Sequence, residues 1–199
     1  MRTFDTTPIQ SHPLDEWRSI HKTKWVVITG ASCSGKSTVI EKLSSLGYAC
    51  INEVARAHFD EQIAEGIESQ TIRSNEGQFQ LEVMNKKLEV EAKLNPDDLV
   101  FLDRGMPDSI TYYRRAGINP NSVASECMRF RYRLVFIFHQ LPHVMDKIRN
   151  ESKEENRLIQ KWLKRDYESM GYTVVDVPVL PIKDRVDLVL TEIKESENA

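Results

Sequence analysis

The sequence WVVITGASCSGKST, which runs from Trp25 to Thr38, joins an apolar segment to one rich in glycine and serine. Its first five residues are apolar or β-branched and predict a short buried strand that stops at Gly30. Gly30 and Gly35 bracket four small residues, and a Lys-Ser-Thr tripeptide and a helical pattern follow. This order of strand, glycine-rich loop, lysine and helix is typical of a phosphate-binding loop.

The backbone N–H groups of such a loop, together with the positive end of the following helix, bind a polyphosphate. We therefore assign nucleotide binding to the whole loop, namely Gly30, Ala31, Ser32, Cys33, Ser34, Gly35, Lys36, Ser37 and Thr38. Lys36 would reach the β- and γ-phosphates of ATP, and the Ser37 hydroxyl would complete the shell of a magnesium ion, Mg²⁺. The alternative is a chance turn, which needs four specified positions to coincide and is expected in under about 1% of chains this long.

The composition limits the kinds of partner. The chain has 199 residues, which fits one domain, and its formal net charge of -3 offers no broad basic surface for nucleic acid or an anionic membrane. Three widely spaced cysteines indicate neither a disulfide framework nor a zinc site. No apolar segment approaches the roughly 20 residues of a membrane span. We expect a soluble, cytoplasmic protein whose partners are small molecules.

Apolar segments alternate with helical patterns along the chain. The predicted strands are residues 25–29, 48–52, 99–102, 134–138 and 172–177. The predicted helices begin after the loop and then cover about residues 53–62, 76–94, 107–116, 121–131, 158–170 and 182–193, with Leu81, Met84 and Leu88 on one apolar stripe. This alternation predicts an α/β fold with a parallel five-stranded sheet and helices on both faces. Residues 1–24 are expected to form an arm before a single domain at 25–199.

Several polar residues follow directly after predicted strands. Ligands of parallel α/β sheets bind at the carboxyl ends of the strands. Gly30, Glu53, Asp103, His139 and Pro178 are therefore expected at one edge of the sheet.

Asp103 ends an apolar strand, as does the acid that holds magnesium in phosphate-loop enzymes, and we assign it to the metal together with Ser37. The alternative is a solvated acid at a strand end. Arg104 follows directly and is either a phosphate clamp or the ion-pair partner of a nearby acid.

Glu53 stands at the end of the second predicted strand, with Arg56 one helical turn later. A carboxylate there could accept the proton of a substrate hydroxyl or orient a ribose, whereas the alternative is an acid that favours a helix N-terminus. We assign catalysis to Glu53 and substrate binding to Glu53, Arg56, Arg104 and Asp108.

The charged segment from Arg149 to Arg157 has two interpretations. It could be a lid that brings Arg149 and Arg157 onto the transferred phosphate, which would make both arginines catalytic. The alternative is a solvated charged helix, which the charge pattern alone favours.

Four blocks in order resemble a known family: the phosphate loop, INEVAR from Ile51, FLDRGMPDSITYYR from Phe101, and GYTVVDVPVLPIKDRVDLVL from Gly171. Together they resemble the AAA-type ATPase/kinase-like domain of the bifunctional NAD-biosynthesis regulator and the TRPL translocation defect protein. The resemblance implies a P-loop fold with strand order 2-3-1-4-5, and adenine near the loop from Pro178 to Pro181. Nucleoside kinases of similar architecture carry a carboxylate base where Glu53 stands and lid arginines that Arg149 and Arg157 would match.

The sequence favours an ATP- and magnesium-dependent kinase that acts on a small hydroxylated substrate, for which we expect a nucleoside or nucleotide-like compound. The alternative is a switch that hydrolyses ATP or GTP and reports nucleotide occupancy to a partner. An Asn/Thr-Lys-x-Asp motif for guanine is absent from the sequence. Glu53 supplies a carboxylate that nucleotide hydrolysis would not need, and this favours the kinase.

Overall fold

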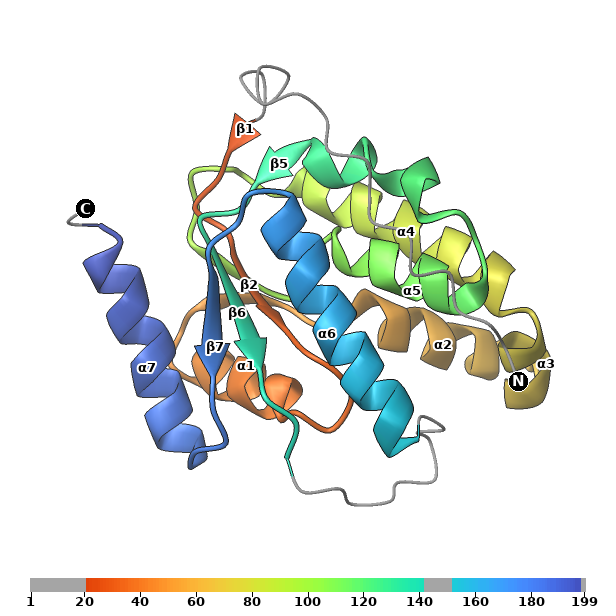
Figure 1. Cartoon of the computed structure of the whole chain (residues 1–199), viewed down its shortest axis with the longest axis horizontal. Coiled ribbons are helices and arrows are strands. Elements are labelled where there is room, and N and C mark those ends of the chain that lie inside the picture. Colours follow the sequence, from red (N-terminus) through yellow and green to blue (C-terminus); the bar gives the residue numbers. More distant parts are fainter. Residues whose placement is uncertain (1–20, 142–151, 198–199) are drawn as a thin grey trace.

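The computed structural model describes residues 21–141 and 152–197, and its centre is a sheet flanked by helices (Figure 1). The strands of this sheet are β2 (Val26–Thr29), β3 (Ala49–Ile51), β4 (Val100–Asp103), β6 (Leu134–Phe138) and β7 (Val174–Val177). The helices are α1 (Lys36–Ser45), α2 (Val54–Ala64), α3 (Ser69–Ser74), α4 (Glu76–Lys93), α5 (Asp108–Ala116), α6 (Lys153–Ser169) and α7 (Ile182–Glu195).

All neighbouring strands of the sheet are parallel, in the order β3-β4-β2-β6-β7. Counted along the chain, this is the order 2-3-1-4-5 that the family resemblance implied. The register places Ile28 beside both Asp103 and Phe136, so β2 is the central strand. The carboxyl end of β2 therefore lies between those of β4 and β6, and the residues after these strands meet at one edge.

Alternate residues of each strand face opposite layers of helices because side chains alternate across a strand. Val26 and Ile28 pack with buried residues of α1 and α7, such as Val39 and Val189. Trp25 and Val27 face the other layer, which α4, α5 and α6 supply through residues that include Met84, Ile110 and Tyr167. Helices thus cover both faces of the sheet, as predicted.

Some local expectations were wrong. Residues 121–131 do not form one helix: they contain two short 3₁₀ helices, η2 (Pro120–Val123) and η3 (Glu126–Met128), and the strand β5 (Phe130–Arg131). Leu81 is 44% exposed, because α4 turns Val83, Met84, Lys87 and Glu91 inward instead. The two charged members of that face prevented its recognition as a buried stripe.

The last residues of the expected N-terminal arm contact the domain. β1 (His21–Lys22) pairs in parallel with β5 in a second, two-stranded sheet. Thr23 is buried, and its N–H donates to the carbonyl of Arg131. Residues 1–20 lie outside the described part of the chain. Within the described ranges, we find no helix with the length and apolar character needed to cross a membrane.

Candidate functional site

The phosphate loop connects β2 to α1 and depends on two glycines. Gly30 has φ +142°, and a β-carbon there would lie 2.5 Å from the carbonyl oxygen of Phe138 on β6. Gly35 has φ +76° and is the N-cap of α1. Residues with a side chain rarely adopt positive φ, so both positions favour glycine. Cys33, between them, also has a positive φ of +59°.

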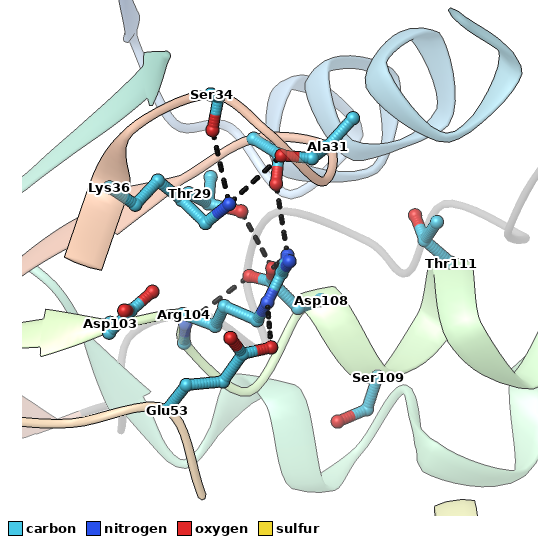
Figure 2. Close-up of polar contacts among 12 residues, drawn as sticks. Thr29, Ala31, Ser34, Lys36, Glu53, Asp103, Arg104, Asp108, Ser109 and Thr111 are labelled. Carbon is cyan, nitrogen blue, oxygen red and sulfur yellow. Dashed lines mark hydrogen bonds and ion pairs between the residues drawn. The ribbon is translucent and has the colours of Figure 1, made fainter. Parts of the chain in front are cut away.

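Lys36 is buried and bonded to its own loop. Its Nζ donates to the carbonyl of Ala31 at 2.9 Å and to the Ser34 hydroxyl at 3.1 Å (Figure 2). Burial, and then the nearby charge of Arg104, lower the pKa of Lys36 from 10.5 to about 8. The ammonium group thus donates hydrogen bonds to neutral acceptors at the point where the loop would hold phosphates.

Ser37 and Asp103 form a pair across the first turn of α1 and the end of β4. The Ser37 hydroxyl donates to Asp103 Oδ2 at 3.1 Å. The other oxygen, Oδ1, is buried and has no hydrogen-bond partner, and burial raises the pKa of Asp103. A buried carboxylate oxygen without a donor is costly. A cation bridging the hydroxyl and the carboxylate would satisfy it, so the pair fits Mg²⁺, which prefers oxygen ligands.

Arg104 joins three parts of the sheet edge. Its Nε donates to Glu53 Oε1 at 2.8 Å, and its Nη1 donates to Asp108 Oδ1 and to the carbonyl of Gly30, both at 3.1 Å (Figure 2). Its guanidinium also lies over the ring of Tyr112, 5.1 Å from the ring centre. We call Arg104, Glu53 and Asp108 the Arg104 cluster. Of the two roles considered for Arg104, the structure shows the ion-pair partner.

The backbone at Arg104 has a strained conformation. Its φ is +73°, a conformation that residues other than glycine seldom adopt. Its N–H donates to the carbonyl of Ile28, and the next residue, Gly105, would place a β-carbon 2.8 Å from the Tyr167 hydroxyl. Strain of this kind persists where surrounding contacts over-determine the backbone. Here those contacts aim the guanidinium along the sheet edge.

Glu53 is ionised and only partly covered. Burial alone would raise the pKa of Glu53, but the positive charges of Arg104 and Lys36 lower it from 4.5 to about 2. Its side chain is 25% exposed, whereas that of Arg104 is 5% exposed. The carboxylate can therefore be reached from outside while one of its oxygens is held by Arg104.

Asp108 lies deeper than the sequence suggested. It is fully buried, and its Oδ1 accepts from Arg104 and from the Thr29 hydroxyl. Its Oδ2 accepts from the Gly105 N–H and from the Tyr167 hydroxyl at 2.6 Å. Four protein donors thus satisfy a side chain that has no exposed surface. The structure therefore contradicts the expected contact of Asp108 with a substrate and shows a group that orients Arg104.

The other assigned residues lie farther from these contacts or outside the described chain. Arg56 is exposed on the first turn of α2, and Arg157 is exposed on α6. Pro178 is exposed directly after β7. Arg149 falls outside the described residues, so the lid interpretation has a described structure only from residue 152 onward, where the chain enters α6. There the charged segment is a helix with Ser152 as its N-cap.

His139 follows β6 at the expected edge and pairs with Asp176 at 3.0 Å, and Asp176 also pairs with Lys164. These contacts link β6, β7 and α6. They do not include a residue of the phosphate loop or of the Arg104 cluster.

Three residues on neighbouring helices form hydrogen bonds to backbone groups of the site and were not identified from the sequence. Gln160 of α6 accepts from the Ala31 N–H at 2.8 Å and donates to the carbonyl of Phe138. Arg185 of α7 donates to the carbonyl of Ser34 at 3.0 Å. Lys87 of α4 is buried and donates to the carbonyl of Gly105 at 2.9 Å. Only Lys87 left a signal, because it repeats the spacing of the apolar residues Val83 and Met84 around one helix face.

Comparisons with known proteins agree with this architecture. The model of a family described as AAA domain matches residues 25–185. No curated protein sequence matches the chain. Among solved structures, that of NadR protein in complex with NR has a TM-score of 0.64 at 15% identity, covering 87% of this chain and 50% of that one. The chain thus spans half the length of that NadR chain.

Two smaller kinases also have similar structures. Deoxyadenosine kinase from M. mycoides has a TM-score of 0.57 at 15% identity, over 86% of this chain and 99% of that one. Thymidylate kinase from Candida albicans has a TM-score of 0.53 at 16% identity, over 89% and 93%. At such identities the likeness shows the fold, which is that of a P-loop kinase. Because the AAA-domain model covers most of its length, the chain belongs to that family, as a P-loop protein with a kinase-like fold.

Proposed function

We propose that the protein is a kinase that transfers the γ-phosphate of ATP to the hydroxyl of a nucleoside or nucleotide-like acceptor. The observation that carries the proposal is the position of Glu53. Its partly exposed carboxylate is held by Arg104, and the same Arg104 also contacts the carbonyl of Gly30 in the phosphate loop. One side chain thus connects a candidate base to the loop that would hold the phosphate donor.

On the donor side, the N–H groups of residues 30–38 bind the triphosphate at the positive end of α1. Lys36 exchanges the carbonyl of Ala31 and the Ser34 hydroxyl for the β- and γ-phosphates. Ser37 and Asp103 hold Mg²⁺, which when bound neutralises charge on the phosphates. Pro178 lies at the start of the loop proposed to receive adenine.

On the acceptor side, Glu53 accepts a hydrogen bond from the acceptor hydroxyl and later its proton. Because its pKa is about 2, the carboxylate is a weak base, and it gains the proton only as the new oxygen–phosphorus bond forms. Arg104 and Asp108 fix its position. Arg56, Arg149 and Arg157 are proposed to meet the acceptor or the transferred phosphate once ligands are bound.

The names of the similar structures support this acceptor class. They include deoxyadenosine kinase, thymidylate kinase and a NadR complex with NR. We propose by analogy a nucleoside or nucleotide acceptor. The few, widely spaced cysteines favour a cytoplasmic enzyme.

The test combines an acceptor screen with two variants. Nucleosides, nucleotides and ribosides are screened for stimulation of ADP release, and the best acceptor is used in single-turnover assays. A positioned base contributes about 10²- to 10⁴-fold, so Glu53→Gln should slow transfer by that order with little change in ATP affinity. Glu65→Gln, at the exposed far end of α2, is the matched control and should transfer at the parent rate.

The rival function gives a different result. A hydrolytic switch would show no stimulation by any acceptor, and its basal hydrolysis would be equal in Glu53→Gln and the parent. If an acceptor is found but Glu53→Gln transfers phosphate at the parent rate, the kinase stands and the base assignment is wrong.

A further inference from the structure

Arg185 is a buried cation placed against the phosphate loop. It lies on the first turn of α7 and is 4% exposed. Its Nη1 donates to the carbonyl of Ser34 at 3.0 Å. A β-carbon on Gly35 would lie 2.6 Å from Nη1 and 3.3 Å from Nη2, so the guanidinium is in contact with the N-cap of α1. Gly35 is thus small for a second reason besides its backbone conformation.

The charge of Arg185 is not balanced by an acid. Among the residues that the structure describes, no Asp or Glu forms an ion pair with it, and its Nε is buried without a hydrogen-bond partner. Its contacts are the Ser34 carbonyl and the ring of Phe138, 5.9 Å from the guanidinium. In contrast, the buried Arg104 and Arg114 each face carboxylates.

The N-cap region of α1 that Arg185 contacts adds further positive charge. The N-terminus of α1 carries a partial positive charge, and Lys36 is the first residue of that helix. A buried charge without a counter-charge is costly, and burial lowers the pKa of Arg185. Arg185 therefore places a buried positive charge beside the loop that an anion bound in the loop would balance.

We propose that Arg185 is a nucleotide-binding residue whose positive charge stabilises the polyphosphate of ATP in the phosphate loop. This inference rests on the nucleotide binding proposed above and does not depend on which acceptor is phosphorylated. The competing role is that of a structural brace, in which Arg185 only donates a hydrogen bond to the carbonyl of Ser34 and its charge does not affect nucleotide binding. The two roles differ in whether charge or hydrogen-bonding shape matters.

Substitutions at Arg185 separate charge from shape. Arg185→Lys keeps the charge and loses the planar guanidinium, whereas Arg185→Gln keeps an N–H donor and loses the charge. Arg185→Met is a second uncharged variant. Lys183→Gln is the matched control, because Lys183 lies on the same turn of α7 but is exposed and paired with Asp187.

Binding of ATP, ADP and AMP is measured by calorimetry for each variant, with folding checked by thermal unfolding. We expect Arg185→Gln and Arg185→Met to weaken ATP binding about 10-fold or more, with smaller losses for ADP and the smallest for AMP. Arg185→Lys should stay within about 3-fold of the parent, and Lys183→Gln should match it. The graded loss is the signature of a charge acting on the polyphosphate.

Other outcomes overturn the inference. Equal losses for ATP, ADP and AMP would place Arg185 at the base or ribose, or make it a brace. The inference is also overturned if Arg185→Lys binds ATP as weakly as Arg185→Gln, if an uncharged variant binds ATP with the parent affinity, or if both uncharged variants fail to fold. A parent protein that binds no ATP overturns the proposed function as well, whereas a parent that binds ATP without any acceptor leaves this inference intact.

Discussion

The phosphate loop and the Arg104 cluster occupy the same edge of the sheet but balance their charges in opposite ways. In the loop, the ammonium of Lys36 rests on the carbonyl of Ala31 and the hydroxyl of Ser34, both neutral. In the cluster, Arg104 faces two carboxylates, Glu53 and Asp108. The positive charge of Lys36 thus has no carboxylate in direct hydrogen-bond contact, whereas the positive charge of Arg104 is paired with two carboxylates.

This difference indicates which region receives an anion and which one positions a reacting group. A cation that hydrogen-bonds only to neutral groups gains most from a polyphosphate. A cation already paired with two carboxylates gains little from an anionic ligand, but it holds a carboxylate in a defined place. We expect the fold to tolerate substitution of Lys36 in the loop better than substitution of Arg104 in the cluster.

The largest expected effect follows from removing Arg104. Arg104→Met leaves two carboxylates without their cation, one of them fully buried, and should lower the free energy of unfolding by about 3–5 kcal/mol. Lys36→Met should cost less than Arg104→Met, since Lys36 hydrogen-bonds only to neutral groups and acts on the carboxylates of Glu53 and Asp103 without an ion-pair contact. Equilibrium unfolding in urea measures both.

The control for this pair is Arg129→Met, which removes an exposed arginine paired with Glu126 and should change stability by less than about 1 kcal/mol. Equal destabilisation by Arg104→Met and Lys36→Met would show that the two regions do not differ as described.

The next effect concerns the unpaired oxygen of Asp103, which lies between the two regions. If Asp103 binds magnesium, Asp103→Asn should raise the Mg²⁺ concentration needed for half-maximal turnover by about 10-fold or more. Nucleotide binding without metal should not weaken, because a negative charge near the phosphates is removed. Metal titrations of turnover, with calorimetry in a chelator, test both statements.

Asp97→Asn, which changes an exposed acid near the opposite end of β4, is the control for this experiment. Superimposable metal titrations of Asp103→Asn and the parent would assign Asp103 a structural role.

The smallest effect is a pH dependence of ATP binding set by Lys36. Its pKa of about 8 in the free protein should rise when a polyphosphate replaces neutral acceptors. Below pH 8 Lys36 is protonated in both states and affinity is flat. Above pH 8 the free protein loses a proton that the complex keeps, so affinity should fall by up to about 10-fold per pH unit.

Calorimetry between pH 7 and 9.5 measures this slope, together with the uptake of a proton on binding. The terminal phosphate of ATP is already fully ionised there, because its last pKa is about 6. Lys36→Arg remains protonated and should give a flat profile at whatever affinity it retains. A flat profile for the parent would mean that Lys36 does not meet the phosphates.

Much of the fold could be predicted because its signals are local. The features of the phosphate loop lie within a few residues of one another: the apolar strand, Gly30, Gly35 and Lys36. Likewise, the spacing of apolar residues that predicts each helix or strand lies within that element. The parallel sheet, the helices on both faces and the position of Asp103 at the end of β4 are confirmed, and so is the strand order that the family resemblance implied. The 3₁₀ turns of residues 120–128 were missed because short turns have weak periodicity.

Burial of polar residues was not predictable in the same way. Asp108 and Arg104 stand four residues apart, a spacing typical of an ion pair, but nothing in the sequence shows that Thr29 and Tyr167 also bond to Asp108. These partners come from β2 and α6, far apart in the chain. Asp108 was therefore assigned to a substrate although protein donors occupy it.

The phosphate loop could be assigned from the residues alone, because a loop of this kind is built from the backbone of consecutive residues and needs glycine at fixed positions. The pairing of charges, in contrast, became visible only in the folded chain. Glu53, Arg104 and Arg185 belong to segments separated by many residues, and their contacts arise when parallel strands bring their carboxyl ends to one edge. A charge has no preferred partner in the sequence, because its energy depends on distance and burial in the folded chain.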